Sequence, residues 1–144
     1  METVRVDLTF DSTTTTGVYP TVEIKLNDSV LCPTKIINGT EKISFDVNLI
    51  DKQSYSLVIV RGNHCNKGEQ LLSIKKIEAD KINLNKLLDD VYCYPEYPKQ
   101  WLDEQTKAGH DWPEKQKGWR DLGFNGRWII EFDSPFYTWL LKNT

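Results

Sequence analysis

Hydrophobic and polar residues alternate along much of the first ninety residues of this chain. The alternation is clearest at residues 4–10, where Val4, Val6, Leu8 and Phe10 would share one face of an extended segment. A period of two is that of a β-strand with one buried face. We therefore expect strands at residues 4–10, 22–26, 43–49 and 71–77, with a return strand through Val30 and Leu31.

Short turn signals separate these segments. The pairs Asn27-Asp28, Asn38-Gly39 and Asp51-Lys52 suit tight turns between neighbouring strands. Residues 55–60 are apolar on both faces, which predicts a central strand covered on both sides. About six or seven short strands without a long helical period predict an all-β fold, an antiparallel β-sandwich of jelly-roll type.

Residues 92–144 differ in composition from the rest of the chain. They contain all five Trp, four of the six Tyr and three of the five Phe. We therefore divide the chain into a β-sandwich core at residues 1–91 and an aromatic C-terminal extension at 92–144, packed on the same domain. In the extension we expect one to three short helices and a last strand at 127–133.

Three features place these elements. Pro98 and Gly109 bracket a predicted helix that carries Trp101, and a second helical turn is expected at residues 113–118. Ser134 is expected to cap a terminal helix that begins at Pro135. Phe136, Trp139 and Leu140 follow the spacing of one helix face, and with Trp128 and Phe132 they are expected in the core or in an assembly contact.

Charge and composition exclude several classes of function. The 144 residues suit one domain, and the net charge of −3 with a pI near 5.4 disfavours nucleic acid as a partner. The N-terminus alternates charged and apolar residues, so we expect no signal peptide and synthesis in the cytoplasm. No apolar run is long enough for a membrane span. Three cysteines without CxxC spacing indicate neither a disulfide framework nor a zinc site.

The strand cadence of residues 3–86 resembles that of jelly-roll carbohydrate-binding modules, particularly the small calcium-dependent xylan-binding type. The resemblance rests on residues 22–28, an apolar strand ending near Arg61-Gly62-Asn63, and residues 72–78. It implies a calcium ion that contacts sugar hydroxyls. The loop at 63–69 supplies one carboxylate, Glu69, whereas calcium takes six to eight oxygens. We therefore carry over the fold and expect no metal and no other cofactor.

Several residue pairs could carry catalysis, and each has a simpler explanation. His110-Asp111 could be a base and its orienting carboxylate, but adjacent residues of an extended chain face opposite ways. His64-Cys65 could be a nucleophile with its base, but the pair is more typical of a plain loop. The pairs Asp89-Asp90 and Asp103-Glu104 are more typical of solvated helix faces than of a glycosidase site. We expect a protein that binds and does not catalyse.

The aromatic residues of the extension are the main candidates for a binding surface. Sugars and protein partners both dock on exposed rings, whereas a segment poor in regular structure also needs rings for its own packing. Core packing therefore stays open beside these two functions. The candidate residues for an interface or a glycan site are Tyr94, Tyr97, Trp101, Trp112 and Trp119.

The end of the chain, residues 126–141, is similar to the tails of small virion-associated proteins of tailed bacteriophages. This resemblance covers about the last 50 residues and implies a capsid-decoration or tail-associated protein located in the virion. Its partners would be other virion proteins, a second copy of the chain and a surface glycan. A virion protein acting through protein contacts is therefore our first functional hypothesis. The alternative is a module that binds cell-surface polysaccharide.

Overall fold

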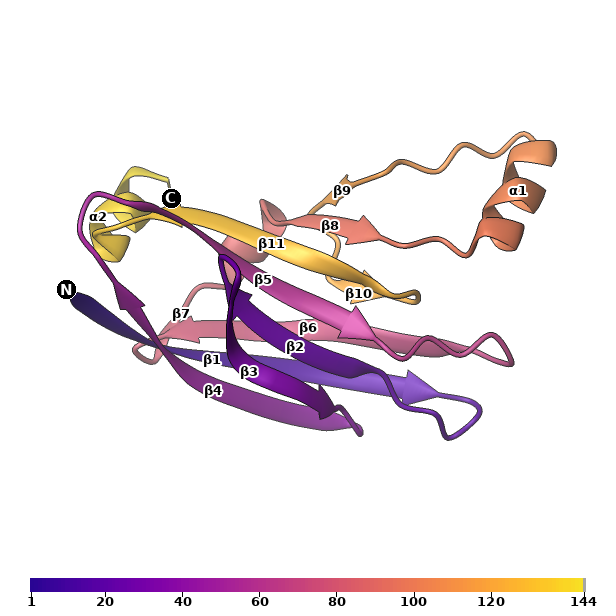
Figure 1. The fold of residues 1–144 in the computed structure, drawn as a ribbon, viewed down its shortest axis with the longest axis horizontal. Helices are drawn as coiled ribbons and strands as arrows, with labels where there is room; N and C mark the ends of the chain where they lie inside the picture. The colour runs from indigo at the N-terminus through magenta and orange to yellow at the C-terminus, as the bar shows by residue number, and fades with distance from the viewer. Residues whose placement is uncertain (144) are drawn as a thin grey trace.

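The structure is a computed structural model, which describes residues 1–143, and it forms two antiparallel sheets packed face to face (Figure 1). Within these residues the strands are β1 (Glu2–Thr14), β2 (Thr21–Leu26), β3 (Ser29–Ile36), β4 (Thr40–Leu49), β5 (Ser54–Gly62), β6 (Gln70–Ala79), β7 (Ile82–Asn83), β8 (Tyr92–Pro95), β9 (Gln116–Lys117), β10 (Asp121–Leu122) and β11 (Gly126–Asp133). The helices are the 3₁₀ turn η1 (Asn85–Asp89), α1 (Lys99–Lys107) and α2 (Phe136–Lys142).

Sheet A has the strand order β10-β6-β1-β4 with β7 paired to β6, and sheet B has the order β3-β2-β5-β11-β8-β9. This arrangement confirms the predicted all-β antiparallel sandwich. No helix within residues 1–143 has the length and hydropathy needed to cross a bilayer.

The first strand shows how the alternating pattern becomes a core. Val4, Val6, Leu8 and Phe10 are all buried, as the pattern predicts, and they face the other sheet. β1 pairs with β4 over ten consecutive residue pairs without a shift, and with β6 across one shift between Thr9 and Phe10. The buried faces of both sheets form one continuous apolar core.

The central strand of sheet B corrects one prediction. β5 lies between β2 and β11, so its central place is confirmed. Tyr55, Leu57 and Ile59 are buried, but Val58 and Val60 on the other face are only half-buried. The expected cover on both sides is wrong, because the second face is an outer surface of the sandwich that only neighbouring side chains shield.

The aromatic extension contributes strands to both sheets. β11 pairs with β5 over eight residues and with β8 on its other side, and β10 joins sheet A beside β6. The last strand was expected at residues 127–133, and it begins one residue earlier at Gly126. Trp128 and Phe132 of this strand are buried in the core.

The predicted helices are confirmed in part. α1 begins after Pro98, which stands at its N-cap and not at its first turn, and Gly109 follows the helix with a positive φ of 84°. The helical turn expected at residues 113–118 is absent there, because β9 forms instead and pairs with β8. The turn η1 was not expected; it buries Leu87 and Leu88 in the core.

The start of α2 also differs from the prediction. Pro135 and not Ser134 stands at the N-cap, and no side chain of the cap residue bonds to the helix. The Ser134 hydroxyl instead donates to the Ile50 carbonyl and accepts from the Gln53 N–H at 3.1 Å. The first helical N–H, that of Phe136, donates to Oε1 of Glu2 at 2.8 Å, so β1 provides the missing cap.

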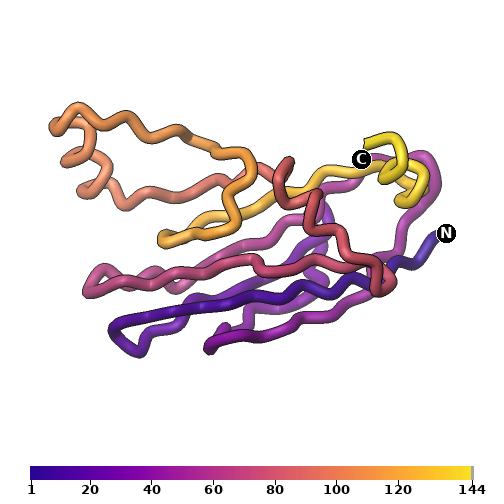
Figure 2. Tube along the Cα trace, turned by 180° about the vertical axis from the view of Figure 1, so that it is seen from behind, coloured from indigo at the N-terminus to yellow at the C-terminus, as the bar shows by residue number. Residues whose placement is uncertain are grey.

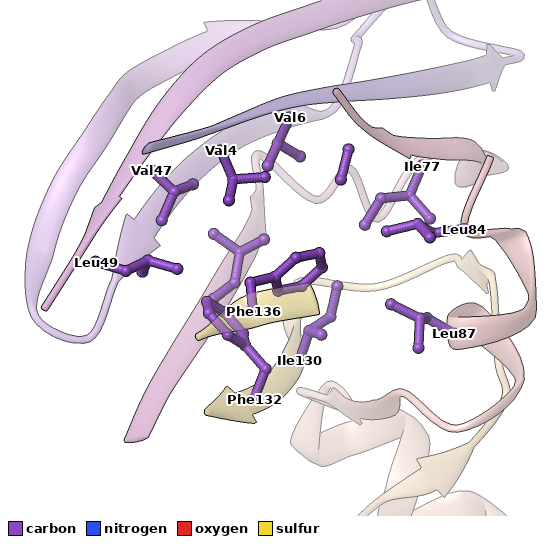
Figure 3. A pocket seen from close by; sticks show the side chains of 12 residues that line it. Val4, Val6, Val47, Leu49, Ile77, Leu84, Leu87, Ile130, Phe132 and Phe136 are labelled. Atoms are coloured by element: carbon purple, nitrogen blue, oxygen red, sulfur yellow. The ribbon is translucent and has the colours of Figure 1, made fainter. Parts of the chain in front are cut away.

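A small void lies in the core beside α2 (Figure 3). Its volume is about 30 Å³ and every side chain that lines it is apolar, from Val4 on β1 to Phe136 on α2. A void of this size with no polar wall holds neither a sugar nor a stable water. It is a packing gap and not a binding site.

The burial of α2 leads to a stability prediction. Phe136 is buried, and its ring packs edge-on against Phe132 at a centroid distance of 5.5 Å. Phe136→Ala is expected to lower the free energy of unfolding by about 3–5 kcal/mol, because it empties a buried aromatic site. Urea denaturation measures the change.

Leu141 on the same helix is the matched control, since it is 80% exposed. Leu141→Ala is expected to change the free energy of unfolding by less than about 0.5 kcal/mol. Equal losses in both variants would show that α2 does not seal the core through Phe136.

Candidate functional site

The helix α1 projects beyond the strands at one end of the sandwich (Figures 1 and 2). Four aromatic rings from α1 and the segments near it contact one another. We call Tyr97, Trp101, Trp112 and Phe124 the aromatic cluster. Trp101 lies at its centre, with ring centroids 5.0 Å from Phe124, 5.3 Å from Trp112 and 5.6 Å from Tyr97. All four rings are half-buried, so each keeps part of its surface accessible to solvent.

Hydrogen bonds at its rim fix the cluster. The Tyr97 hydroxyl donates to the Pro113 carbonyl at 2.9 Å, and Trp112 Nε1 donates to Gln105 Oε1 of α1 at 3.2 Å. Gln116 Nε2 donates to the Tyr97 hydroxyl at 3.3 Å. These bonds tie α1 and the segment before it to the chain that returns from the helix.

A shallow cleft of about 390 Å³ opens beside the cluster. The rings of Trp101 and Phe124 form its apolar wall. Three segments contribute: the β5–β6 loop, residues 98–104 at the start of α1, and the β10–β11 loop. The cleft is lined by His64, Cys65, Asn66, Gly68, Pro98, Gln100, Trp101, Glu104 and Phe124.

A buried arginine joins the two loops that border the cleft. Arg61, at the end of β5, is only 1% exposed. Its guanidinium donates to Oε1 of Gln70 at 2.7 Å and to Oδ1 of Asn125 at 3.0 Å. The same Asn125 oxygen accepts the His64 N–H at 2.8 Å. Burial lowers the pKa of Arg61 to about 10, so it stays charged at neutral pH.

His64 stands between this network and the cleft. Its ring meets Phe124 edge-on at a centroid distance of 5.4 Å. Burial, and then the positive charge of Arg61, lower the pKa of the imidazole below its usual 6.5. His64 is therefore neutral at pH 7, and a neutral imidazole has one donor and one acceptor nitrogen.

The structure brings together three of the five predicted binding residues. Tyr97, Trp101 and Trp112 share the cluster, but Tyr94 lies under the Arg127 guanidinium, 4.7 Å from its ring centroid. Trp119 is 45% exposed and borders a separate hollow with Leu71 and Arg120.

Sequence reasoning missed two residues of the site, Phe124 and His64. Phe124 is a single aromatic residue in an irregular run, and its only signal was the neighbouring Gly123 and Gly126, which indicate a loop. His64 was weighed only as the partner of Cys65. The pairing of distant strands places both residues beside Trp101.

The remaining chemical candidates lie in unremarkable settings. Among residues 1–143, no group of three or more His, Cys, Asp or Glu side chains could hold a metal ion. The Glu69 N–H donates to the Thr15 hydroxyl at 3.0 Å, which ties the loop at 63–69, where calcium-dependent xylan-binding modules would hold their ion, to the end of β1. His110 and Asp111 are both exposed, outside the cleft. Burial raises the pKa of the Cys93 thiol to about 12, so it stays protonated.

The depressed pKa of His64 leads to a prediction about pH. The unfolded chain binds this proton more readily, so the free energy of unfolding is expected to fall as pH drops from about 6.5 through the lower folded pKa. An NMR titration of the His64 ring is expected to give a midpoint below 6.5. Arg61→Met is expected to raise that midpoint, because it removes a nearby positive charge; an unchanged midpoint would contradict this account.

Comparison with known proteins identifies a similar fold for this chain but no family to which it belongs. No protein family and no curated protein sequence matches this chain. Among solved structures, the chain is similar to "vCBM60 in complex with galactobiose", with a TM-score of 0.56 and 8% sequence identity over 88% of this chain and 96% of that one. The likeness to bacteriophage virion proteins finds no support, and the virion location stays an untested prediction. The protein thus shares the β-sandwich fold of a carbohydrate-binding module.

Proposed function

We propose that this protein binds a glycan in the cleft beside Trp101 and acts without turnover. The observation that carries the proposal is the pairing of two half-buried rings, Trp101 and Phe124, with polar side chains in one cleft. A sugar presents an apolar C–H face that packs on an aromatic ring, while its hydroxyls need hydrogen-bond partners nearby. The cleft volume of about 390 Å³ lies in the range of small-molecule sites.

The polar residues of the cleft match what sugar hydroxyls require. Gln100 and Asn66 carry side-chain amides that both donate and accept, and Glu104 accepts. Neutral His64 adds to this set without introducing a charge. Each hydroxyl of a bound sugar is both donor and acceptor, so a mixed lining of this kind suits a neutral glycan.

The carboxylates of the cleft argue for binding over hydrolysis. Glycosidases of the usual kind place two carboxyl groups on either side of the scissile bond, about 5–9.5 Å apart. Among the residues that line this cleft, Glu104 is the one carboxylate. A pair that could protonate the leaving group and activate water is therefore not assembled here.

The structural neighbour supports the same choice of ligand class. That protein was solved with galactobiose, and its β-sandwich matches most of this chain. Galactobiose is therefore the first probe to use, followed by a panel of neutral polysaccharides that includes xylan and galactan.

The first functional prediction compares two tryptophans. Trp101→Ala is expected to weaken binding of the best polysaccharide by at least about 30-fold, equivalent to about 2 kcal/mol, because it removes the central ring of the cleft. Trp119→Ala is the matched control, since Trp119 is exposed and lies outside the cleft. Affinity electrophoresis measures both variants, and circular dichroism confirms that they fold.

A second variant separates loss of binding from loss of fold. Glu104 is exposed on α1 and is not part of the aromatic cluster, so Glu104→Ala is expected to keep the melting temperature and to weaken glycan binding. Retardation that survives in both Trp101→Ala and Glu104→Ala, or that disappears in Trp119→Ala alone, would place the binding surface elsewhere.

A further prediction concerns calcium. Binding and folding are expected to be independent of it, since a cation that bound only the folded protein would raise the melting temperature. Melting curves and affinity electrophoresis in excess chelator and in millimolar calcium are expected to coincide. A clear upward shift of the melting temperature with calcium would contradict this prediction and favour calcium-dependent glycan binding, as in xylan-binding modules.

A further inference from the structure

The sheet edges of this protein are unequally protected. Within residues 1–143, one edge of sheet A is formed by the two-residue strands β7 and β10, which both pair with β6. One edge of sheet B is formed by the two-residue strand β9, which pairs with β8. The edge strand β3 contains Pro33 and has two register shifts against β2. Short strands, proline and irregular pairing are the usual devices that stop an edge from pairing with another chain.

The fourth edge, β4, is neither short nor irregular, and its exposed charged side chains are of both signs. It has ten residues, contains no proline, and pairs with β1 without a shift. β4 lies at the lower boundary of the molecule in both views, with no strand beyond it (Figures 1 and 2). A long regular edge of this kind is a template for another strand.

The register with β1 tells which backbone groups of β4 are free. Backbone groups of successive residues point to alternate sides of a strand. The Ser12 N–H donates to the Gly39 carbonyl at 3.0 Å. The backbone N–H and C=O groups of the odd-numbered residues from Gly39 onward therefore point toward β1. On the other side of β1, the Arg5 carbonyl accepts from Asp80 at 2.7 Å, which agrees with the same alternation. The even-numbered residues of β4, from Thr40 to Asn48, therefore direct their N–H and C=O groups outward.

The side chains of these same residues are exposed and carry a self-complementary charge pattern. Lys42 and Asp46 stand two residues on either side of Ser44, and their side chains are 56% and 54% exposed. An antiparallel pair of identical strands centred on Ser44 places Lys42 of one copy opposite Asp46 of the other. Opposite charges directly across two strands stabilise the pair.

We propose that β4 pairs antiparallel with β4 of a second copy, about a two-fold axis at Ser44. The two A sheets then form one continuous sheet. In the other registers that satisfy the backbone, Lys42 lies opposite an uncharged residue or opposite a second Lys42. The register centred on Ser44 puts opposite charges together twice, because a two-fold axis repeats every contact.

The existing ion pairs of sheet A fit this register. Arg5 Nη1 lies 3.3 Å from Asp46 Oδ1, on the outer face of the sheet. In the proposed dimer Lys42 of the second copy lies on the other side of Asp46, so charges alternate across three neighbouring strands. Ile43 and Phe45, already buried on the core face, come opposite each other in the two copies. Both faces of the sheet thus accept the pairing.

Sedimentation equilibrium of the whole protein tests the oligomeric state. The proposal expects a reversible dimer, twice the 16.7 kDa of the chain. Asp46→Lys and Lys42→Asp are each expected to raise the dissociation constant at least about tenfold, because each puts like charges opposite twice. The double variant exchanges the charges and is expected to recover dimerisation. Lys75→Glu on the interior strand β6 is the matched control and is expected to have no effect.

A second pair of variants tests the backbone directly. Ser44→Pro removes an outward N–H that no group within residues 1–143 accepts, and an edge strand tolerates proline at such a position. It is expected to give a folded monomer, whereas Ser44→Ala keeps the N–H and is expected to stay dimeric. Melting curves of both variants confirm folding, and an unfolded Ser44→Pro leaves the charge exchange as the deciding test.

Amide hydrogen exchange locates the interface. Protection of the Lys42, Ser44 and Asp46 amides is expected to rise with protein concentration, while the odd-numbered amides between them are already protected at low concentration. Four results would overturn the proposal. The protein stays monomeric at about 1 mM, Ser44→Pro is folded and still dimeric, the double charge-exchange variant does not recover dimerisation, or the protein assembles beyond a dimer. The outcome is independent of the glycan site, since Trp101→Ala is expected to dimerise as the unmodified protein does.

Discussion

The pairing of β5 with β11 is the interaction on which the rest of this structure depends. The two strands lie about seventy residues apart in the chain, and their pairing runs from Ser54–Asp133 at one end to Arg61–Gly126 at the other. Only glycine fits at that last position, because an added Cβ at Gly126 would lie 2.5 Å from the Tyr94 carbonyl oxygen of β8. The register therefore ends where the β5–β6 and β10–β11 loops leave the sheet together.

The candidate site is a consequence of that ending. His64 follows Arg61, the last paired residue of β5, by three positions, and Phe124 precedes Gly126, the first paired residue of β11, by two. Their loops therefore lie side by side, and the two rings meet. The buried Arg61 guanidinium connects the two loops by hydrogen bonds to Gln70 and Asn125. Burying a charged guanidinium among neutral partners carries a desolvation cost, which the large apolar core of both sheets offsets. The site is thus held rigid at some expense of local stability.

The proposed cleft and the proposed dimer edge lie on different parts of the molecule. The cleft is formed by loops and α1 at one end of the sandwich, whereas β4 lies along the outer edge of sheet A. Pairing through β4 would leave the cleft of each copy open. A dimer with two clefts gains avidity on a polysaccharide that repeats its sugar units, even when each cleft binds weakly.

The sequence by itself determined the fold class and most of the strands. The alternation of β1, β4 and β11 is local, and a period of two needs no knowledge of partners. The sequence also indicated the C-terminal anchor and the concentration of rings after residue 92. Which strands become neighbours was decided only in the tertiary structure, because several strands with similar alternation can pair with one another equally well. The half-exposure of Val58, the cap that Glu2 provides for α2, and the meeting of Trp101 with Phe124 all depend on such long-range pairing, so periodicity along the chain could not reveal them.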